Sequence, residues 1–216
     1  MKDQFKSPWP GTGTGGSLAL DFANTLDWRL RKRPVELLRA FPDLLRWGWS
    51  GGALGRAEVG RLRAWAGSHP RAAARALTKA IEVREAIAAV FRARIRGKTP
   101  PSGPLRRLEA ACRMAWAART LQPSGRATGW AWRKGASDPN RLAWAAALDA
   151  AHLLTSADCR FVRQCGDAEC GWFFLDTSRS HSRRWCSMKS CGNRNKVRAF
   201  YRRVAARRAR TSKREA

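Results

Sequence analysis

The sequence predicts a mainly α-helical protein with small β elements, an α+β fold in which a helical N-terminal domain precedes a small cysteine-bearing unit. Three observations indicate this. Apolar residues recur at helical spacing between residues 42 and 156, proline and glycine interrupt that spacing, and four of the six cysteines lie in residues 160–216. Hydrophobic residues make up 44% of the 216-residue chain, which is enough to bury a core.

The chain is strongly basic, with 43 Lys and Arg against 16 Asp and Glu and a formal net charge of +27. Positive charge is densest at the C-terminal end: residues 1–159 carry 27 basic and 12 acidic residues, whereas residues 160–216 carry 16 and 4. A bias toward arginine in the whole composition explains part of the total. A polyanionic partner, above all nucleic acid, explains its concentration at one end.

The apolar segments are short. No uninterrupted apolar run approaches the roughly 20 residues of a membrane-spanning helix, and no apolar segment precedes the Gly/Pro-rich stretch near the N-terminus, as it would in a secretory signal. We therefore expect a cytoplasmic protein with no membrane partner, associated with the nucleoid when bound.

Residues 1–16 are rich in glycine, proline and threonine and predict a flexible lead. Their GTGTGG run lacks the preceding strand and the following Lys-Ser/Thr pair of a phosphate-binding loop. Residues 17–157 are expected to form a mostly helical domain, because apolar residues recur three or four positions apart between the breaks. Helices are predicted over residues 42–50, 56–67, 70–97, 105–121 and 139–156, with a β-hairpin or ordered loop over 123–139.

Two charged residues interrupt apolar segments of this domain: Asp21 in LALDFA, and Arg84 in the apolar stripe of the longest helix. Because a lone buried charge is costly, we expect the two side chains to meet as a buried ion pair. The alternative is that Asp21, Asn24, Arg29 and Arg84 line a small-molecule pocket, which would make the domain an effector sensor. Dimerisation is a further role for it.

The four C-terminal cysteines form two pairs. Cys165 and Cys170 are followed, after fifteen residues, by Cys186 and Cys191. Two such pairs predict one tetrahedral Zn²⁺ site of structural type, and the alternative, two disulfides, is disfavoured in the cytoplasm. His181 lies nearby and is expected to be exposed or to contact a phosphate rather than the metal. Four thiolates leave zinc no position for water, which argues against metal catalysis. No His/Asp/Ser set or carboxylate pair has a recognisable catalytic spacing, so we expect no enzyme.

The residues around the pairs predict a hairpin followed by a helix. Residues 160–164 and 172–175 can pair as strands whose turn holds the first cysteines, and Ser187 can cap a helix that holds the second pair. This is the treble-clef arrangement of a zinc finger, predicted over residues 158–208 and followed by a basic disordered tail over 209–216. One apolar stripe of the helix is expected to pack on the hairpin, formed by Val197, Phe200, Tyr201 and Val204.

The run CGWFFLDTSRSHSRRWCSMKSCGNRNKVRAFYRR, which includes Cys191-Gly192-Asn193-Arg194, resembles the CGNR zinc finger. LALDFANTLDWR, from Leu18 to Arg29, is similar to the opening motif of the ABATE domain that precedes this finger in bacterial proteins described as stress-induced transcription regulators. A helix with LRE-like residues, here Val83-Arg84-Glu85, adds to the similarity. The resemblance implies zinc on the four matching cysteines and a DNA-binding role for the basic residues.

Basic residues of the finger cover most of the predicted final helix and the loop before it. Asn193 and Arg194 are candidates for contacts with base edges, because Asn pairs with adenine and Arg with guanine. An equally weighted alternative is that Gly192 and Asn193 shape the helix start around the metal, with the Asn193 amide bonding a cysteine sulfur or the backbone. The predicted nucleic-acid contacts are Arg179, Arg183, Arg184, Lys189, Asn193, Arg194, Lys196, Arg198, Arg202 and Arg203.

Two classes of function follow. The first is a transcription regulator in which a sensor or dimerisation domain, responding to an unknown small-molecule effector, precedes a zinc-ordered DNA-binding finger. The second is an RNA- or ribosome-associated protein, which would display aromatic stacking surfaces on its finger. Burial of Trp172, Trp185 and Tyr201 together would favour the first.

Overall fold

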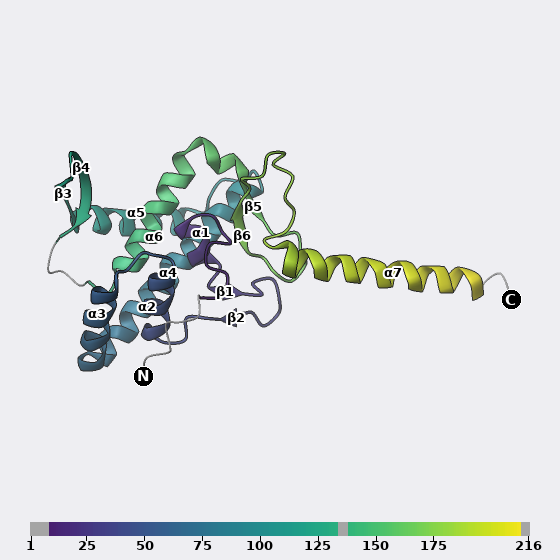
Figure 1. The fold of residues 1–216 in the computed structure, drawn as a ribbon, viewed down its shortest axis with the longest axis horizontal. Helices are drawn as coiled ribbons and strands as arrows, with labels where there is room; N and C mark the ends of the chain where they lie inside the picture. The colour runs from purple at the N-terminus through teal and green to yellow at the C-terminus, as the bar shows by residue number, and fades with distance from the viewer. Residues whose placement is uncertain (1–8, 134–137, 213–216) are drawn as a thin grey trace.

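The chain folds into a helical body from which one long helix projects (Figure 1). This computed structural model describes residues 9–133 and 138–212, except for the side chains of residues 124 and 207–212. The α-helices are α1 (Leu18–Ala23), α2 (Phe41–Ser50), α3 (Arg56–Ser68), α4 (Pro70–Ile95), α5 (Ser102–Ala117), α6 (Arg141–Thr155) and α7 (Asn193–Ser212). The mainly helical α+β fold class is confirmed.

In the part of the chain that the structure describes, three two-stranded antiparallel sheets accompany the helices. They pair β1 (Leu26–Asp27) with β2 (Val35–Glu36), β3 (Arg119–Ser124) with β4 (Ala127–Trp132), and β5 (Val162–Gln164) with β6 (Phe173–Leu175). A 3-10 helix, η1 (Ala157–Phe161), leads into β5, and a π-helical turn, η2 (Met188–Gly192), leads into α7.

The body is built around α4, which packs against α1, α5 and α6. Proline occupies the start of α4, where the missing amide hydrogen costs nothing, and small side chains such as Ala76 and Ala80 on its buried face let neighbouring helices approach. Gly48 of α2 serves the same purpose, since a Cβ there would lie 2.4 Å from a methyl group of Leu142.

The hairpin predicted over residues 123–139 is present but begins earlier than expected. Its first strand starts at Arg119, so the preceding helix ends at Ala117 rather than at residue 121. Residues 134–137 lie outside the described residues. The Trp130 side chain is 50% exposed and meets the ring of Trp116 edge-on, so it faces outward.

The prediction of a flexible lead over residues 1–16 is wrong for its second half. The Trp9 ring is buried in the main core, and the Gly13 and Gly15 amides donate hydrogen bonds of 2.7 Å to the Asp21 carboxylate. Residues 1–8 lie outside the described residues. An N-terminal segment rich in glycine is thus held in place by one acidic side chain and one tryptophan.

The cysteine-bearing hairpin is part of the body. Val162 and Phe173 belong to the same buried cluster as the helices. β5 covers one edge of β6, and the other edge is covered by the N-terminal part of the chain: the Asn24 side chain exchanges two hydrogen bonds with the Phe173 backbone, at 2.8 and 2.9 Å, and the Leu175 amide donates to the Gly15 carbonyl. Hence the two sequence regions share one core.

The beginning of α7 is bound to the rest of the molecule through Arg194, Asn195 and Arg198, and the helix then extends away from the body (Figure 1). The predicted packing of its apolar stripe on the hairpin is wrong, because Val197, Phe200 and Tyr201 are 45%, 55% and 66% exposed. The helix runs to Ser212 and so includes the first part of the tail expected to be disordered; residues 213–216 lie outside the described part. Among the described residues, no helix combines the length and apolarity needed to cross a membrane.

Candidate metal centre

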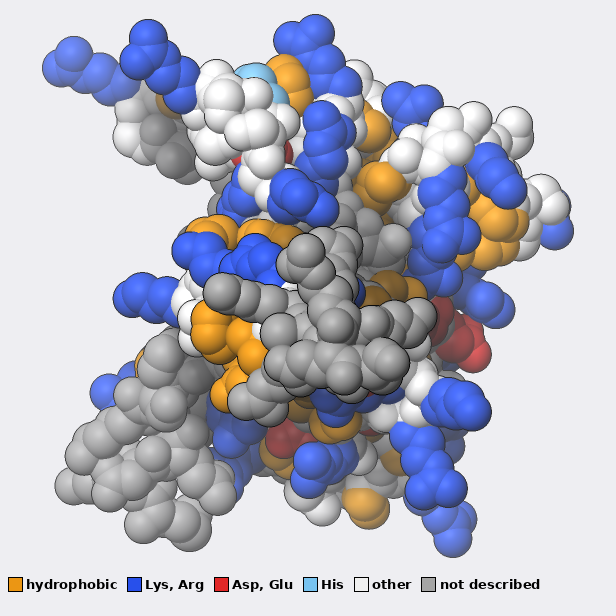
Figure 2. All heavy atoms as spheres, turned by 90° about the vertical axis from the view of Figure 1, so that its right-hand side faces the viewer, with side chains coloured by type: hydrophobic (Ala, Val, Ile, Leu, Met, Phe, Trp, Pro, Cys, Tyr) orange, Lys and Arg blue, Asp and Glu red, His pale blue; other side chains and the backbone are white. Residues whose placement is uncertain are grey.

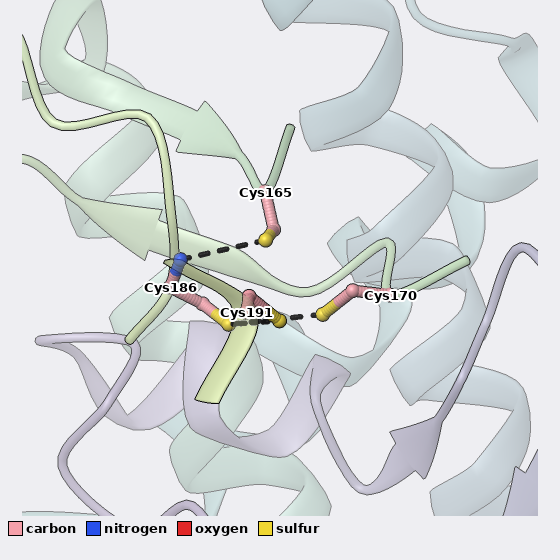
Figure 3. A group of neighbouring side chains, drawn as sticks. All are labelled: Cys165, Cys170, Cys186 and Cys191. Atoms are coloured by element: carbon pink, nitrogen blue, oxygen red, sulfur yellow. Dashed lines mark hydrogen bonds between the residues drawn. The ribbon is translucent and has the colours of Figure 1, made fainter. Parts of the chain in front are cut away.

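The four paired cysteines meet at one buried point between the β5–β6 hairpin and the start of α7 (Figure 3). Cys165 follows β5, Cys170 lies in the turn before β6, Cys186 ends the loop after β6, and Cys191 lies in the π-helical turn η2. Each is 3–4% exposed, and their Sγ atoms all lie within 4.8 Å of one another.

The sulfur spacing fits a zinc ion. Tetrahedral Zn–S bonds of about 2.3 Å place sulfurs about 3.8 Å apart, and the Sγ atom of Cys186 lies 3.7 Å from that of Cys170 and 3.5 Å from that of Cys191. Disulfide sulfurs would be bonded at about 2.05 Å, and all these cysteines are free. The prediction of one structural zinc on these residues is confirmed.

Hydrogen bonds around the sulfurs suit thiolates. The Cys186 amide faces the Cys165 Sγ at 3.5 Å, and the Arg194 guanidinium donates to the Cys191 Sγ at 3.0 Å. The Gly166 amide, in the turn from Cys165 to Cys170 that we call the metal knuckle, donates to the Arg184 carbonyl. This bond links the metal knuckle to the loop that carries Cys186. Donors directed at the sulfurs stabilise negative charge, and bound zinc would link the hairpin to the final helix.

The start of the predicted finger helix differs from the structure, whereas His181 agrees with the expectation. Ser187 makes no side-chain cap, because the π-helical turn η2 precedes α7 and the regular helix begins only at Asn193. His181 is exposed, as expected, and lies outside the cysteine cluster. Its ring stacks on Phe161 with centroids 3.7 Å apart, and its Nδ1 lies 2.8 Å from the Asp176 carbonyl oxygen, so it helps to fix the loop.

A buried carboxylate that the sequence analysis missed joins the metal knuckle to α7. Asp167 is 1% exposed and binds the side chains of Arg194, at 3.1 Å, and Asn195, at 2.7 Å. Burial opposes its ionisation, but hydrogen bonds from the Glu169 amide and these two side chains outweigh that effect and hold the pKa of Asp167 below its ordinary value. The sequence feature that could have identified Asp167 is its position between the metal-binding residues Cys165 and Cys170.

A loop of the N-terminal region lies against the same knuckle. In this β1–β2 loop, residues 28–34, the Arg29 amide donates to the Cys170 carbonyl and the Leu30 amide to the Glu169 carbonyl. A Cβ on Gly171, whose φ is +74°, would lie 2.8 Å from the Leu30 side chain, so glycine is required there. Trp28 takes the left-handed conformation, with φ of 50°.

Cation–π and ionic contacts extend this junction to α7. The Arg194 guanidinium lies 4.4 Å from the centroid of the Trp28 ring, and Arg31 lies 3.4 Å from it. Glu169 pairs with Arg31 and with Arg198 of α7, at 3.1 and 3.0 Å. Both partners hold the pKa of Glu169 below its usual range. Arg194 therefore binds a carboxylate, a sulfur and an aromatic ring at once, so the bond to a cysteine sulfur expected of Asn193 is made by Arg194, and Asn193 is exposed.

The expected ion pair between Asp21 and Arg84 is wrong. Arg84 is buried, as expected, but both its terminal nitrogens bind Glu36, at 2.6 and 2.7 Å, and its Nε binds Glu85. The Asp21 carboxylate instead accepts hydrogen bonds from the backbone amides of Gly13 and Gly15 in the N-terminal lead. Burial raises the pKa of Asp21, and those amides partly offset the rise.

Arg29 completes this network. Its guanidinium binds Glu85 at 2.6 Å and the Ala23 carbonyl at 2.7 Å. Burial lowers the pKa of Arg29 and Glu85 opposes that shift. The four residues proposed to line a small-molecule pocket, Asp21, Asn24, Arg29 and Arg84, therefore each have intramolecular partners: Asn24 supports β6, Asp21 holds the lead, and the two arginines hold Glu36 and Glu85.

The predicted nucleic-acid contacts separate into two groups. The guanidiniums of Arg183, Arg194 and Arg198 are bound within the finger, Arg183 to the carbonyls of Trp185 and Cys186. Arg184 lies over the Trp185 ring, 5.4 Å from its centroid, and is otherwise exposed. The other residues of the set face solvent, namely Arg179, Lys189, Asn193, Lys196, Arg202 and Arg203.

Figure 2 looks at the face from which α7 projects. Lys and Arg side chains border much of this face, and acidic side chains are few. By sequence, the 20 residues of α7 contain seven Arg, one Lys and no Asp or Glu. Burial of Trp172, Trp185 and Tyr201 together was expected to favour a transcription regulator over an RNA-binding protein. The three are not buried together: Trp172 and Trp185 are half-buried beside the cysteines, whereas Tyr201 is exposed.

Comparison with protein-family models gives two matches. Residues 16–157 match the ABATE model, described as "Putative stress-induced transcription regulator", and residues 161–210 match the CGNR zinc finger. A search of curated proteins finds no match. The architecture expected from the sequence, an ABATE region followed by a CGNR finger, is confirmed.

Proposed function

Because the chain belongs to the ABATE family and carries a CGNR zinc finger, we propose that it is a zinc-dependent DNA-binding transcription regulator and not an enzyme. The observation that carries the proposal is α7. This helix is fixed to the zinc site at one end, and it then presents a positively charged surface without acidic residues to solvent.

The dimensions of α7 suit a DNA groove. Twenty residues of α-helix span about 30 Å, and a helix about 10–12 Å across enters the major groove, which is about 12 Å wide. Its anchored base would set the direction in which it meets the duplex. In this proposal Arg202 and Arg203 contact phosphates, and Asn193 remains the candidate for a base edge.

The loop after β6 supplies further contacts. Arg179 is exposed there, between hydroxyl-bearing residues that suit phosphate oxygens. The stacked pair of Phe161 and His181 holds this loop against η1. Residues 17–157 keep the role expected of them, effector sensing or dimerisation, which would act on the finger through the β1–β2 loop.

The test is a salt titration of binding by the full zinc-loaded chain to a mixed-sequence DNA duplex. Six solvent-facing cations, Arg179, Arg184, Lys189, Lys196, Arg202 and Arg203, give an expected log–log salt slope of about −5. The variant Arg202→Gln/Arg203→Gln should reduce that slope by about 2. Arg71→Gln/Arg75→Gln is the matched control, because it removes the same charge from α4 beside α3, away from α7.

The proposal fails if the chain binds equally well after complete zinc removal, or if the control variant lowers the slope as much as the α7 variant. The first result would show that DNA binding does not require the zinc-ordered finger. The second would assign binding to total charge alone.

RNA binding is the second candidate, and the exposed rings of Phe200 and Tyr201 favour it. Base stacking on an aromatic side chain contributes about 1–3 kcal/mol per base. If Tyr201→Ala weakens binding to single-stranded RNA by that amount and leaves duplex DNA binding unchanged, while RNA binds more tightly, the RNA function is favoured. Tighter duplex binding favours the regulator.

A further inference from the structure

A small hollow lies where the end of α4 meets η1 and β5. Its volume is about 180 Å³, and its lining includes three arginines: Arg94 from the last turn of α4, Arg160 from η1 and Arg163 from β5. Buried or half-buried apolar side chains complete it, namely Phe91, Ile95, Cys159 and Val162.

The three guanidiniums lack counter-charges. Within the described residues, no Asp or Glu lines the hollow and none of the three arginines forms an ion pair. Asp158 is close in sequence but does not contribute to the lining. By contrast, two neighbouring arginines of the body, Arg29 and Arg84, share the Glu85 carboxylate. Three cations around one hollow without an anion repel one another.

Two of these arginines are held in place. The Arg163 guanidinium donates to the Arg160 carbonyl at 2.7 Å, and the Arg160 guanidinium lies 4.7 Å from the centroid of the Phe161 ring. Neither contact neutralises charge, and each leaves guanidinium hydrogens free. Arginine binds phosphate oxygens through such paired donors, which are rigid and remain charged at every physiological pH.

We propose that this hollow binds a phosphate group. Water occupies about 30 Å³ per molecule in the liquid, so the space admits one tetrahedral oxyanion with a few waters but no large ligand. The occupant is either free phosphate or a small phosphomonoester, or a phosphate of a bound nucleic acid. Because α4 belongs to the ABATE region and β5 to the finger, an anion there would bridge the two sequence regions.

The test uses the full zinc-loaded chain and inorganic phosphate as the probe, with ionic strength held constant by chloride. Binding is read from an isothermal titration, because phosphate raises the melting temperature of proteins by exclusion from their surface even when it does not bind. Arg94→Gln/Arg160→Gln should weaken phosphate binding at least about tenfold. Arg96→Gln, an exposed arginine just after α4 that does not line the hollow, should change it less than about twofold.

A second arm identifies the source of the phosphate. The occupant is a backbone phosphate of the nucleic acid if inorganic phosphate does not saturate the protein and the variants differ in their binding to duplex DNA. In that case Arg94→Gln/Arg160→Gln lowers the log–log salt slope by about 2, and Arg96→Gln lowers it by no more than 1. If neither arm separates the double variant from the control, the proposal is overturned. Failure of the wild-type chain to bind DNA would overturn the proposed function but leave the free-phosphate arm decisive.

Discussion

The two ends of α7 contrast more sharply than any other two regions of the molecule. In its first turn, Arg194 and Asn195 bind the buried Asp167, and Trp28 and Glu169 add contacts from outside the helix. Two turns later, Phe200 and Tyr201 are more than half exposed. Arg194 and Arg198 are thus bound within the finger, whereas Arg202 and Arg203 farther along the helix are available to a partner.

Zinc removal is expected to have the largest effect on this comparison. The metal joins the hairpin to α7, and β5 and β6 also belong to the main core. Structural zinc sites contribute several kcal/mol or more to folding, so a chelator should lower the melting temperature of the whole chain and release α7. Circular dichroism with and without chelator measures this. An unchanged melting transition for the body would mean that the hairpin folds without its metal.

The next largest effect is expected in the buried ion network of the body. Arg84→Ala removes a buried side chain together with its ion pairs to Glu36 and Glu85, whose carboxylates are partly exposed, and is expected to cost about 2–5 kcal/mol, mainly through lost packing. Chemical denaturation measures the loss. Arg107→Ala is the control, because it removes an arginine whose pair with Glu82 is exposed and is expected to cost about 1 kcal/mol or less. Equal losses in the free energy of unfolding would show that the buried Arg84 contributes no more to stability than an exposed ion pair.

Asp167→Asn tests the anchored end of α7 directly. The variant keeps the shape of the side chain but removes the charge that Arg194 and Asn195 bind. Losing a charge-assisted hydrogen bond in a buried site costs about 1.5–3 kcal/mol, and fraying of the first turn should weaken zinc retention against a competing chelator. If zinc retention and stability both equal those of the wild-type chain, Asp167 does not anchor the helix.

The smallest effect on stability is expected at the free end. Arg202→Gln/Arg203→Gln alters exposed side chains without described partners, so the free energy of unfolding should change by no more than about 0.5 kcal/mol per residue. Denaturant unfolding checks this on the same preparation used for DNA titration. A loss as large as that of Asp167→Asn would contradict the division of α7 into anchored and free parts.

Much of the fold and the metal site follows from local sequence patterns. Cysteine spacing identified all four zinc ligands, because two short-range pairs need only two turns to present their sulfurs. Hydrophobic periodicity and Pro/Gly breaks located the main helices within a few residues. The burial of Arg84 was also expected, since it occupies an apolar stripe.

The errors involve contacts between residues distant in sequence. Asp21 was paired with Arg84 because both were expected to be buried, but burial alone does not specify a partner. Glu36, the actual partner of Arg84, lies in the two-residue strand β2, which is too short to show a hydrophobic period that would indicate its position. The same holds for Trp9, whose place in the core depends on the fold of the lead that follows it.

The sequence by itself determined the zinc ligands, the helical character of the body and the strong positive charge of the C-terminal region, because spacing, periodicity and composition are local properties. The tertiary structure decided which charges are neutralised. Arg194 is bound by Asp167 and Cys191, whereas Arg202 and Arg203 are exposed and have no partner among the described residues, since the three-dimensional fold brings the buried Asp167 carboxylate to the start of α7.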